Sequence, residues 1–372
     1  MENLEITVEE LQDILENNKP IKIIDIRPQE HRDEWYIPES EHLDVYKQIE
    51  AGEDDIFDNI ELPVDKPIIL VCIEGLISKD GADILQEKGY KAYSLKGGMK
   101  QWNFAYSTKL LENKENDLKI FQIRRVAKGC ISYLIISKDE AVVIDASLSP
   151  EVYISLANKN HSTIKYVMDT HTHADYISRT RELAKTSNTK HIFIDIAQVD
   201  YDYTKVKDRE NIYFGNSVIK IIHTPGHTLD SVSYLLNNEY LFTGDTLFVD
   251  GIGRPDLKAN IDETIYKAGL LYDSLQYILS LDDNINILPS HYSNSIAFTQ
   301  PIIINKIGKI SKNVNILSFN KDKFIDVIMD NMPLPPPNYN DIVEINKRGS
   351  YEDIDIARLE AGANRCGVGK RV

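Results

Sequence analysis

Hydrophobic and polar positions along residues 1–106 alternate in a way that predicts short buried strands separated by helices. The runs at 21–26 and 67–71 are almost entirely apolar, which is typical of strands that are buried on both faces. Residues 78–89 repeat apolar side chains at helical spacing and stop at a glycine, a favoured helix C-cap. Thr7 begins a capping-box pattern at the start of an earlier helix. The pattern therefore predicts an α/β domain with a parallel sheet.

The remaining residues predict a second domain after a short connection. Residues 107–119 are mostly polar and charged, which indicates a linker. Three strand-like apolar runs follow between positions 120 and 144, and helices then alternate with strands. A charged stretch leads to the Pro-Leu-Pro-Pro-Pro segment at 333–337, which we expect to form an extended tether. We therefore place the second domain, with a C-terminal tail, at 120–372.

Composition narrows the classes of partner. The 372 residues carry a net charge of −16, which repels phosphate backbones and anionic membrane surfaces, so we expect no nucleic acid and no membrane partner. No basic and apolar signal region opens the sequence, and no apolar run approaches the ~20 residues that span a bilayer. The three cysteines are an odd, widely spaced set, which favours a reducing, cytoplasmic location over a disulfide framework.

Histidine and aspartate recur where buried strands end. The Thr-His-Thr-His-Ala-Asp-Tyr sequence at 170–176 directly follows an apolar run, and further His and Asp residues follow three later apolar runs. Loops at strand ends are where α/β folds place ligands. Ordinary loop residues would not recur in this way from strand to strand, so we predict a metal site. The candidates are His171, His173, Asp175, His227, Asp245 and His291.

Residues 120–300 resemble the metallo-β-lactamase superfamily through this His-X-His-X-Asp core, which implies an αββα fold. The segments 244–248 and 253–257, together with the tail at 364–368, resemble the persulfide dioxygenase branch. The resemblance implies one Fe(II) per chain, held by the residues that match the family motif, with zinc as the alternative. These are His171, His227 and Asp245. The residue types agree, because two imidazoles and one carboxylate form the facial triad of non-haem iron oxygenases.

A second metal ion is disfavoured by one departure from the superfamily pattern. Position 176 is Tyr where the superfamily usually has His, and a neutral phenol with a reference pKa near ~10 is a poor ligand. We therefore expect His173, Asp175 and His291 to orient the ligands, or to form a latent second metal site. Arg254 follows in a Gly-Arg-Pro turn. We expect it to bind substrate charge at the rim, and the alternative that it binds a loop carbonyl stays open.

Cys72 is the candidate nucleophile of the first domain. It ends an apolar strand and faces the start of a helix, where amides and the helix dipole stabilise a thiolate or a persulfide. Residues 6–106 resemble a rhodanese domain through Asp25-Ile26-Arg27, Cys72-X-X-Gly-X-X-Ser78 and the segment 97–102. The loop after the cysteine carries Glu74 and no basic residue, which argues against thiosulfate as sulfur donor. Cys130 and Cys366 receive no catalytic role.

These features predict a persulfide dioxygenase that oxidises a low-molecular-weight thiol persulfide, such as glutathione persulfide, with O₂ to sulfite and thiol. Sulfane-sulfur transfer at Cys72 is expected to accompany the oxidation. A zinc-dependent thioester hydrolase of the glyoxalase-II type is the main alternative, and a non-catalytic sulfur carrier or sensor is the third. The identity of the thiol and the oligomeric state, a homodimer included, stay open.

Overall fold

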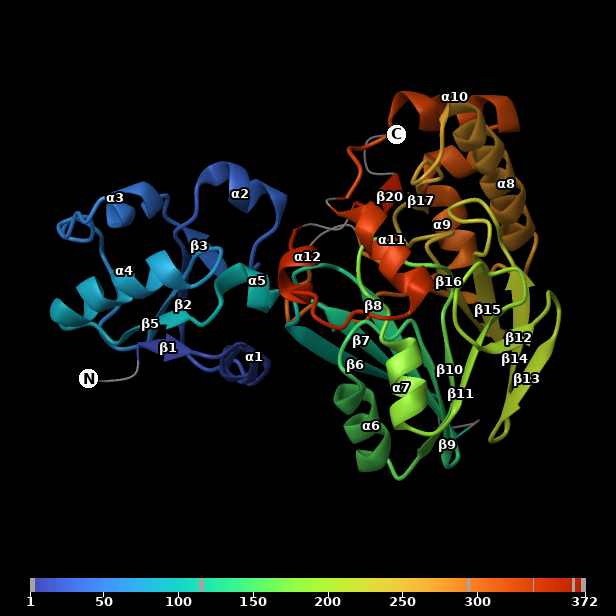
Figure 1. The fold of residues 1–372 in the computed structure, drawn as a ribbon, viewed down its shortest axis with the longest axis horizontal. Coiled ribbons are helices and arrows are strands. Elements are labelled where there is room, and N and C mark those ends of the chain that lie inside the picture. Colours follow the sequence, from blue (N-terminus) through green and yellow to red (C-terminus); the bar gives the residue numbers. More distant parts are fainter. Residues whose placement is uncertain (1–3, 114–116, 293–294, 337, 363–364, 369–372) are drawn as a thin grey trace.

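The protein is described by a computed structural model over residues 4–113, 117–292, 295–336, 338–362 and 365–368. Figure 1 shows a smaller N-terminal domain, in blue and cyan, beside a larger domain that runs from green to red. The C-terminal helices α11 (Tyr339–Arg348) and α12 (Ile356–Leu359) return towards the boundary between the two domains.

The first domain is built on a parallel sheet with the strand order β1-β5-β4-β2-β3 in the described part of the chain. Its strands are β1 (Glu5–Ile6), β2 (Lys22–Asp25), β3 (Ser40–His42), β4 (Ile68–Val71) and β5 (Ala92–Leu95). Its helices are α1 (Val8–Glu16), α2 (Gln29–Glu34), α3 (Tyr46–Glu50), α4 (Leu76–Glu87) and α5 (Gly98–Trp102). The predicted capping box at Thr7 is present, because its side chain accepts from the Glu10 amide while the Glu10 carboxylate accepts from the Thr7 amide.

The second domain contains two facing sheets. The larger sheet has the order β12-β11-β10-β9-β8-β7-β6, antiparallel from β6 to β9 and parallel beyond. Its strands are β6 (Tyr106–Asn113), β7 (Leu118–Arg125), β8 (Ile131–Ser137), β9 (Glu140–Ile144), β10 (Thr163–Met168), β11 (Lys190–Ile194) and β12 (Thr204–Val206). The smaller sheet has the order β13-β14-β15-β16-β18-β19. Its strands are β13 (Asn211–Phe214), β14 (Ser217–His223), β15 (Val232–Leu236), β16 (Tyr240–Gly244), β18 (Asn286–Pro289) and β19 (Asn305–Lys306).

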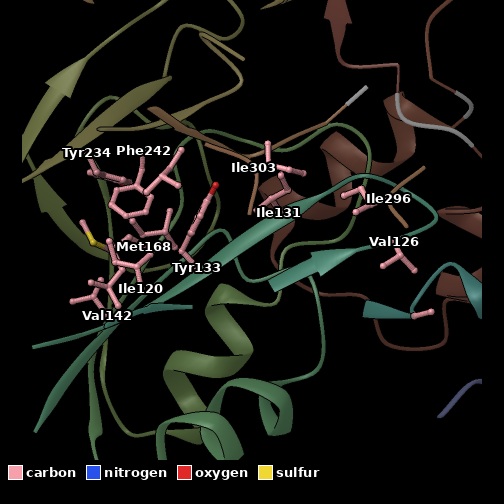
Figure 2. Packing of buried hydrophobic residues seen from close by; sticks show 14 of the residues in the cluster. Ile120, Val126, Ile131, Tyr133, Val142, Met168, Tyr234, Phe242, Ile296 and Ile303 are labelled. Atoms are coloured by element: carbon pink, nitrogen blue, oxygen red, sulfur yellow. The ribbon is translucent and has the colours of Figure 1, made fainter. Parts of the chain in front are cut away.

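Helices cover the outer face of each sheet. The larger sheet packs against α6 (Pro150–Lys159) and α7 (Thr180–Thr186), with Tyr153 and Leu183 buried among its strands. The smaller sheet packs against α8 (Ile261–Leu279), α9 (Ile307–Asn313), η1 (Asn315–Ser318) and α10 (Lys321–Asp330). Apolar side chains from both sheets meet between them, where Tyr133 and Phe242 make an edge contact (Figure 2). The predicted α/β domain followed by an αββα domain is confirmed.

The predicted linker at 107–119 is wrong at both ends, because its first residues lie in β6 and its last two, Leu118 and Lys119, begin β7. Residues 106–113 form β6, which pairs in antiparallel register with β7 along its whole length. The error has a physical cause, because β6 is the last strand of its sheet and seven of its eight side chains are partly or fully exposed. An edge strand of this kind can carry polar residues that also suit a linker. Residues 114–116 lie outside the described part of the chain.

The buried carboxylate of Glu360, just after α12, joins the C-terminal segment to the rest of the molecule. It forms an ion pair with Arg125 at 2.7 Å, with both side chains inaccessible to solvent. It also accepts from the Ile177 amide at 2.7 Å, directly after the candidate metal loop. The backbone carbonyl of Glu360 accepts from Asn103 of the first domain and from Lys128. One residue therefore connects the tail, the first domain and the metal loop. Across the described residues, no helix is long and apolar enough to cross a membrane.

Candidate metal centre

The strand ends of the second domain bring the predicted metal residues together. The loop that follows β10 carries His171, the loop after β14 carries His227, Asp245 directly follows β16, and His291 follows β18. Because β10 lies in one sheet and the other three strands lie in the facing sheet, these side chains converge from both sides of the sandwich. Each of the four is buried, with about 1% of its surface exposed.

Three of these side chains present unpaired ligand atoms to one another. His171 Nε2 lies 3.8 Å from Asp245 Oδ2, and His227 Nε2 lies 3.6 Å from the same oxygen. None of the three atoms has a hydrogen-bond partner among the described residues, although all are buried. Buried polar atoms are almost always paired, so three that converge without partners fit a shared metal ion. His171, His227 and Asp245 therefore fit the ligand set of a bound metal ion.

Hydrogen bonds orient the two imidazoles for ligation. His171 Nδ1 lies 2.9 Å from the Thr170 hydroxyl, which itself donates to Asp145 at 2.8 Å. The hydroxyl proton is thus committed to Asp145, so the hydroxyl accepts from Nδ1 and leaves the Nε2 lone pair of His171 available. His227 Nδ1 similarly donates to the Arg254 carbonyl at 2.7 Å. Burial holds the pKa of His171 well below its usual range and lowers that of His227 to about 3, so both rings are neutral ligands.

His173 is placed beside the triad but is held by other partners. Its Nε2 lies 3.2 Å from Asp145 Oδ1 and 2.9 Å from the Tyr176 hydroxyl. Burial alone would lower the pKa of His173, but the Asp145 carboxylate raises it above the usual value. Burial raises the pKa of Tyr176 well above its usual range, so the phenol stays neutral. Tyr176 therefore acts as a hydrogen-bond partner of His173 and does not supply an anionic ligand.

His291 bridges two carboxylates. Its Nδ1 is hydrogen bonded to Asp245 Oδ1, and its Nε2 lies 2.9 Å from Asp175 Oδ2. Burial would lower the pKa of His291, but Asp245 and Asp175 together raise it well above its usual range. The ring is therefore protonated on both nitrogens and donates a hydrogen bond to each carboxylate. The bond to Asp245 Oδ1 holds that side chain with Oδ2 directed towards His171 and His227.

Two supporting residues, Asp145 and Asp230, were not predicted from the sequence. Asp145 follows β9 and accepts hydrogen bonds from Thr170, His173 and Ser290. A polar residue directly after a buried strand was the signal that identified the ligands, and the same signal was available for Asp145. Asp230 accepts from the Thr172 hydroxyl at 2.6 Å and so fixes the loop between His171 and His173. That contact joins segments far apart in the sequence and had no local signal.

The predicted role of Arg254 in binding substrate is wrong. Its side chain is fully buried and pairs with Asp256 through two contacts of 2.7 Å. The remaining guanidinium N–H groups donate to the carbonyls of Pro333, Leu334 and Arg365. Every guanidinium donor is therefore used, two on Asp256 and the others on carbonyls of the tether and the tail. Residues 333–336 form no helix or strand, as predicted for the tether, and residue 337 lies outside the described residues.

A pocket of 290 Å³ adjoins the metal centre, and His227 forms part of its wall. Leu257, Val343 and Ala174 contribute an apolar patch. Basic side chains also line it, namely Lys258, Lys267 and Lys347. Burial lowers the pKa of Lys267 to about 8, against the raising effect of nearby carboxylates. Asp230 and Glu263 line the pocket as well, and Lys258 is ion-paired with Glu344, so the pocket combines an apolar wall with side chains of both charges beside His227.

Cys72 of the first domain sits in the cradle that the sequence predicted. Its Sγ accepts from the Gly75 amide at 3.1 Å, from the Ser78 hydroxyl at 3.2 Å and from the Ser78 amide at 3.5 Å. Gly75 has φ +86°, and a Cβ there would meet Gly97 N at 2.8 Å, so glycine is required at this turn. The cradle can hold a thiolate or a terminal persulfide sulfur.

The acidic residue of the Cys72 loop is paired. Lys100, which lies in α5, forms an ion pair with Glu74. The same helix start is fixed to the loop by amide donation from Met99 to the Cys72 carbonyl at 2.9 Å and from Lys100 to the Ile73 carbonyl at 3.0 Å. A basic residue distant in the sequence therefore offsets the charge of Glu74, which the loop sequence alone did not reveal.

Comparisons with known proteins agree with this architecture. A rhodanese-like domain model matches residues 7–105, and a metallo-beta-lactamase superfamily model matches residues 127–291. The chain thus consists of a rhodanese-like domain followed by a domain of the metallo-β-lactamase superfamily, whose members are enzymes.

Individual relatives match mainly the second domain. Hydroxyacylglutathione hydrolase of Francisella tularensis subsp. novicida is 33% identical over 165 residues, which is 43% of this chain and 61% of that relative's length. Among solved structures, a metallo-beta-lactamase from Staphylococcus aureus subsp. aureus COL has a TM-score of 0.55 at 28% identity, covering 66% of this chain and 73% of that one. ETHE1 from Myxococcus xanthus has a TM-score of 0.50 at 26% identity, covering 66% of this chain and 99% of that one.

Proposed function

We propose that the chain is a non-haem iron persulfide dioxygenase whose first domain transfers sulfane sulfur. The observation that carries the proposal is the cluster of His171 Nε2, His227 Nε2 and Asp245 Oδ2, buried and unpaired within the described residues. Two imidazoles and one carboxylate suit Fe(II), which when bound supplies open positions for a persulfide sulfur and O₂. The likeness to ETHE1 supports the same branch of the superfamily.

The reaction balances without a further redox partner. A persulfide anion, O₂ and water give the free thiol, sulfite and one proton. The bond between the two sulfur atoms breaks, the terminal sulfur is oxidised, and O₂ accepts the electrons. Water supplies the third sulfite oxygen and the proton that the leaving thiolate takes up. The part of the protein is to bind and orient the reactants.

The pocket beside the triad fits an anionic thiol. The ammonium groups of Lys267 and Lys347 attract carboxylates, and the apolar wall at Leu257 and Val343 packs against the substrate stem. Lys267 Nζ donates to the Leu257 carbonyl at 3.2 Å, which keeps the charge at the pocket wall. A small peptide thiol such as glutathione has both features. We propose its persulfide as substrate.

Sulfur transfer at Cys72 uses the cradle of Gly75 and Ser78. The Cys72 thiolate attacks the terminal sulfur of a donor persulfide, a new bond between sulfur atoms forms, and the donor leaves as its thiolate. The hydrogen bonds from Gly75 and Ser78 then stabilise the charge on the Cys72 persulfide. Transfer to a small thiol supplies the substrate of the second domain.

A second candidate is a zinc-dependent thioester hydrolase of the glyoxalase-II type, in which a metal-bound water attacks the thioester. The match to hydroxyacylglutathione hydrolase favours it. Tyr176 weighs against its dinuclear form, because the neutral phenol binds His173 and Asp145 instead of a metal.

Two measurements separate the two candidates. The first is the metal content of protein purified from cells grown without added metal, and the second is O₂ uptake with glutathione persulfide, followed with an O₂ electrode. The proposal expects iron and an oxygen uptake that the His171→Ala substitution abolishes. Zinc without oxygen uptake would contradict the dioxygenase. Unchanged activity in the His171→Ala variant would contradict both enzymes and favour a sulfur carrier.

A further inference from the structure

The α7–α11 cavity, with a volume of 880 Å³, lies between α7, the strands β11 and β12, and the end of α11 (Figure 1). It shares no lining residue with the pocket at His227. Ile345 and Asn346 of α11 line the cavity, whereas Val343 and Lys347 of the same helix line the pocket. Ligand sites usually measure about 300–1,000 Å³, so the cavity has the size of a site for a small organic molecule. No step of the proposed reaction uses it.

His191 places an unpaired nitrogen in the wall of this cavity. Its Nε2 lies 3.1 Å from Asp169 Oδ2. The carboxylate accepts this hydrogen bond, so the ring proton is on Nε2 and Nδ1 carries a lone pair. That nitrogen is buried and has no hydrogen-bond partner among the described residues, and 6% of His191 is exposed. Buried polar atoms are almost always paired, so this nitrogen indicates a ligand that donates an N–H or O–H group.

Aromatic rings form much of the same wall. The rings of His191 and Tyr201 are stacked, with centroids 5.7 Å apart, and Tyr203 meets Tyr201 edge-on at 6.5 Å. Tyr351 lines the cavity as well, and the Arg181 guanidinium lies over the Tyr201 ring, 5.2 Å from its centroid. Aromatic rings and guanidinium planes are the surfaces on which nucleic-acid bases stack. The wall therefore suits a planar heterocycle.

Basic side chains line the cavity without acidic partners. They are Arg181, Lys185 and Lys190, and none of them forms an ion pair within the described residues. Arg181 and Lys185 lie one helical turn apart on α7, on the same face of that helix. The whole chain has a net charge of −16 and repels phosphate, so this group of unpaired cations is a local feature. Ammonium and guanidinium groups bind phosphate strongly, which favours a ligand with a phosphate group.

The carboxylates of the lining offer partners for hydroxyl groups. Glu182 is already paired, because it accepts from the Tyr351 hydroxyl and lies 4.0 Å from Arg179. The Asp202 and Glu352 side chains line the cavity and make no hydrogen bond or ion pair within the described residues. Carboxylates bind ribose hydroxyls in nucleotide-binding folds. The lining can therefore bind a sugar between a heterocycle and a phosphate.

We propose that the α7–α11 cavity binds a nucleoside monophosphate. The base lies against the aromatic wall and donates to His191 Nδ1, and the phosphate binds Lys185 and Lys190. The three features on which the proposal rests are the unpaired buried nitrogen, the aromatic wall and the unpaired cations. None of them depends on which metal the triad holds, so the site goes beyond the proposed function.

The cavity adjoins the backbone of the metal loop. Asn346, which lines the cavity, donates through Nδ2 to the His173 carbonyl at 2.9 Å and to the Tyr176 carbonyl at 2.8 Å. Its Oδ1 accepts from the Ser178 amide at 2.9 Å. The lining includes no residue of the triad. A nucleotide in the cavity contacts the support of the metal loop and does not reach the metal-directed atoms, which fits an effector and not a substrate of the metal centre.

Isothermal titration calorimetry of the full-length protein with AMP, UMP, adenosine and inorganic phosphate tests the proposal. We expect AMP or UMP to bind with a Kd below about 1 mM. Adenosine and phosphate each lack part of the contacts and should bind at least about tenfold more weakly. The double variant Lys185→Met/Lys190→Met should bind the nucleotide at least about tenfold more weakly than the wild type. Lys159→Met removes an exposed lysine at the end of α6, away from the cavity, and should leave the affinity unchanged.

Three results would overturn the assignment. Wild-type protein that binds neither AMP nor UMP would exclude the site. Phosphate that binds as tightly as the nucleotides would mean an anion site without recognition of the base. Loss of nucleotide binding in Lys267→Met, with binding kept in the double variant, would place the nucleotide in the pocket at His227. The wild-type titration alone decides the first two, and thermal unfolding of each variant shows that it is folded.

Discussion

The Thr170 hydroxyl gives the sharpest test of how the triad is prepared for a metal. It donates to Asp145 Oδ2 at 2.8 Å and accepts from His171 Nδ1 at 2.9 Å. Thr170→Val keeps the shape of the side chain and removes both hydrogen bonds. His171 then loses the partner that fixes its ring and tautomer, so metal affinity should fall about 10–100-fold, or about 1.4–2.8 kcal/mol. Asp145 keeps the Thr170 amide, His173 and Ser290 as donors, so the metal-free protein should lose only about 1–3 kcal/mol of stability.

Thr172→Val is the matched control. It lies in the same loop and also removes a hydroxyl that donates to a buried carboxylate, that of Asp230, at 2.6 Å. It touches no ligand nitrogen and acts on metal binding only through the loop, so the variant should lose stability but lose less metal affinity than Thr170→Val. Affinity is read by competition with a chromophoric chelator, and stability by urea unfolding of metal-free protein. Equal metal affinities of Thr170→Val and the wild type would contradict the role of Thr170 in orienting His171. An equal loss of metal affinity in Thr170→Val and Thr172→Val would contradict it as well.

Three further predictions concern other parts of the molecule. Cys72→Ser should abolish sulfur transfer from a thiol persulfide and spare O₂ uptake, and survival of both activities would show that the first domain is not acting as a rhodanese. Lys267 has its pKa lowered to about 8, so its positive charge is lost as pH rises through that value. The KM for an anionic thiol persulfide should therefore rise above this pH, while Lys267→Met should have a high KM with a flat profile; a wild-type profile in the variant would contradict this. Glu360→Gln should leave the Arg125 charge unpaired and lower the free energy of unfolding, measured in urea, by about 3–5 kcal/mol. Lys321→Met, at an exposed ion pair, should lower it by less than about 1 kcal/mol, and equal losses in the two variants would contradict the buried pairing.

The strand-end pattern explains why much of the site was predictable. A catalytic or metal residue directly after a buried apolar run is a local signal, and it placed His171, His227, Asp245 and His291 correctly at one edge of the sandwich. The helix cap at Thr7 was equally local. In each case, residues adjacent in the sequence determine where the side chain lies, so the sequence alone predicts its location.

The failures come from contacts between distant segments. The sequence around Arg254 suggested an exposed substrate-binding arginine, but its guanidinium group donates to carbonyls of the tether and the tail. Lys100 in α5 offsets the charge of Glu74 in the loop before α4, and Cys130 contacts Asp175 from 45 residues away in the sequence. The edge strand β6 has the polar composition of a linker because one face is partly exposed. None of these pairings follows from periodicity or spacing.

Reconstitution of metal-free protein with either Fe(II) or Zn(II) decides between the dioxygenase and the hydrolase. With glutathione persulfide, we expect Fe(II) to restore O₂ uptake together with an equal amount of sulfite, and Zn(II) to restore neither. Zinc-loaded protein that cleaves a glutathione thioester, with iron-loaded protein that consumes no O₂, would contradict the dioxygenase and establish the hydrolase.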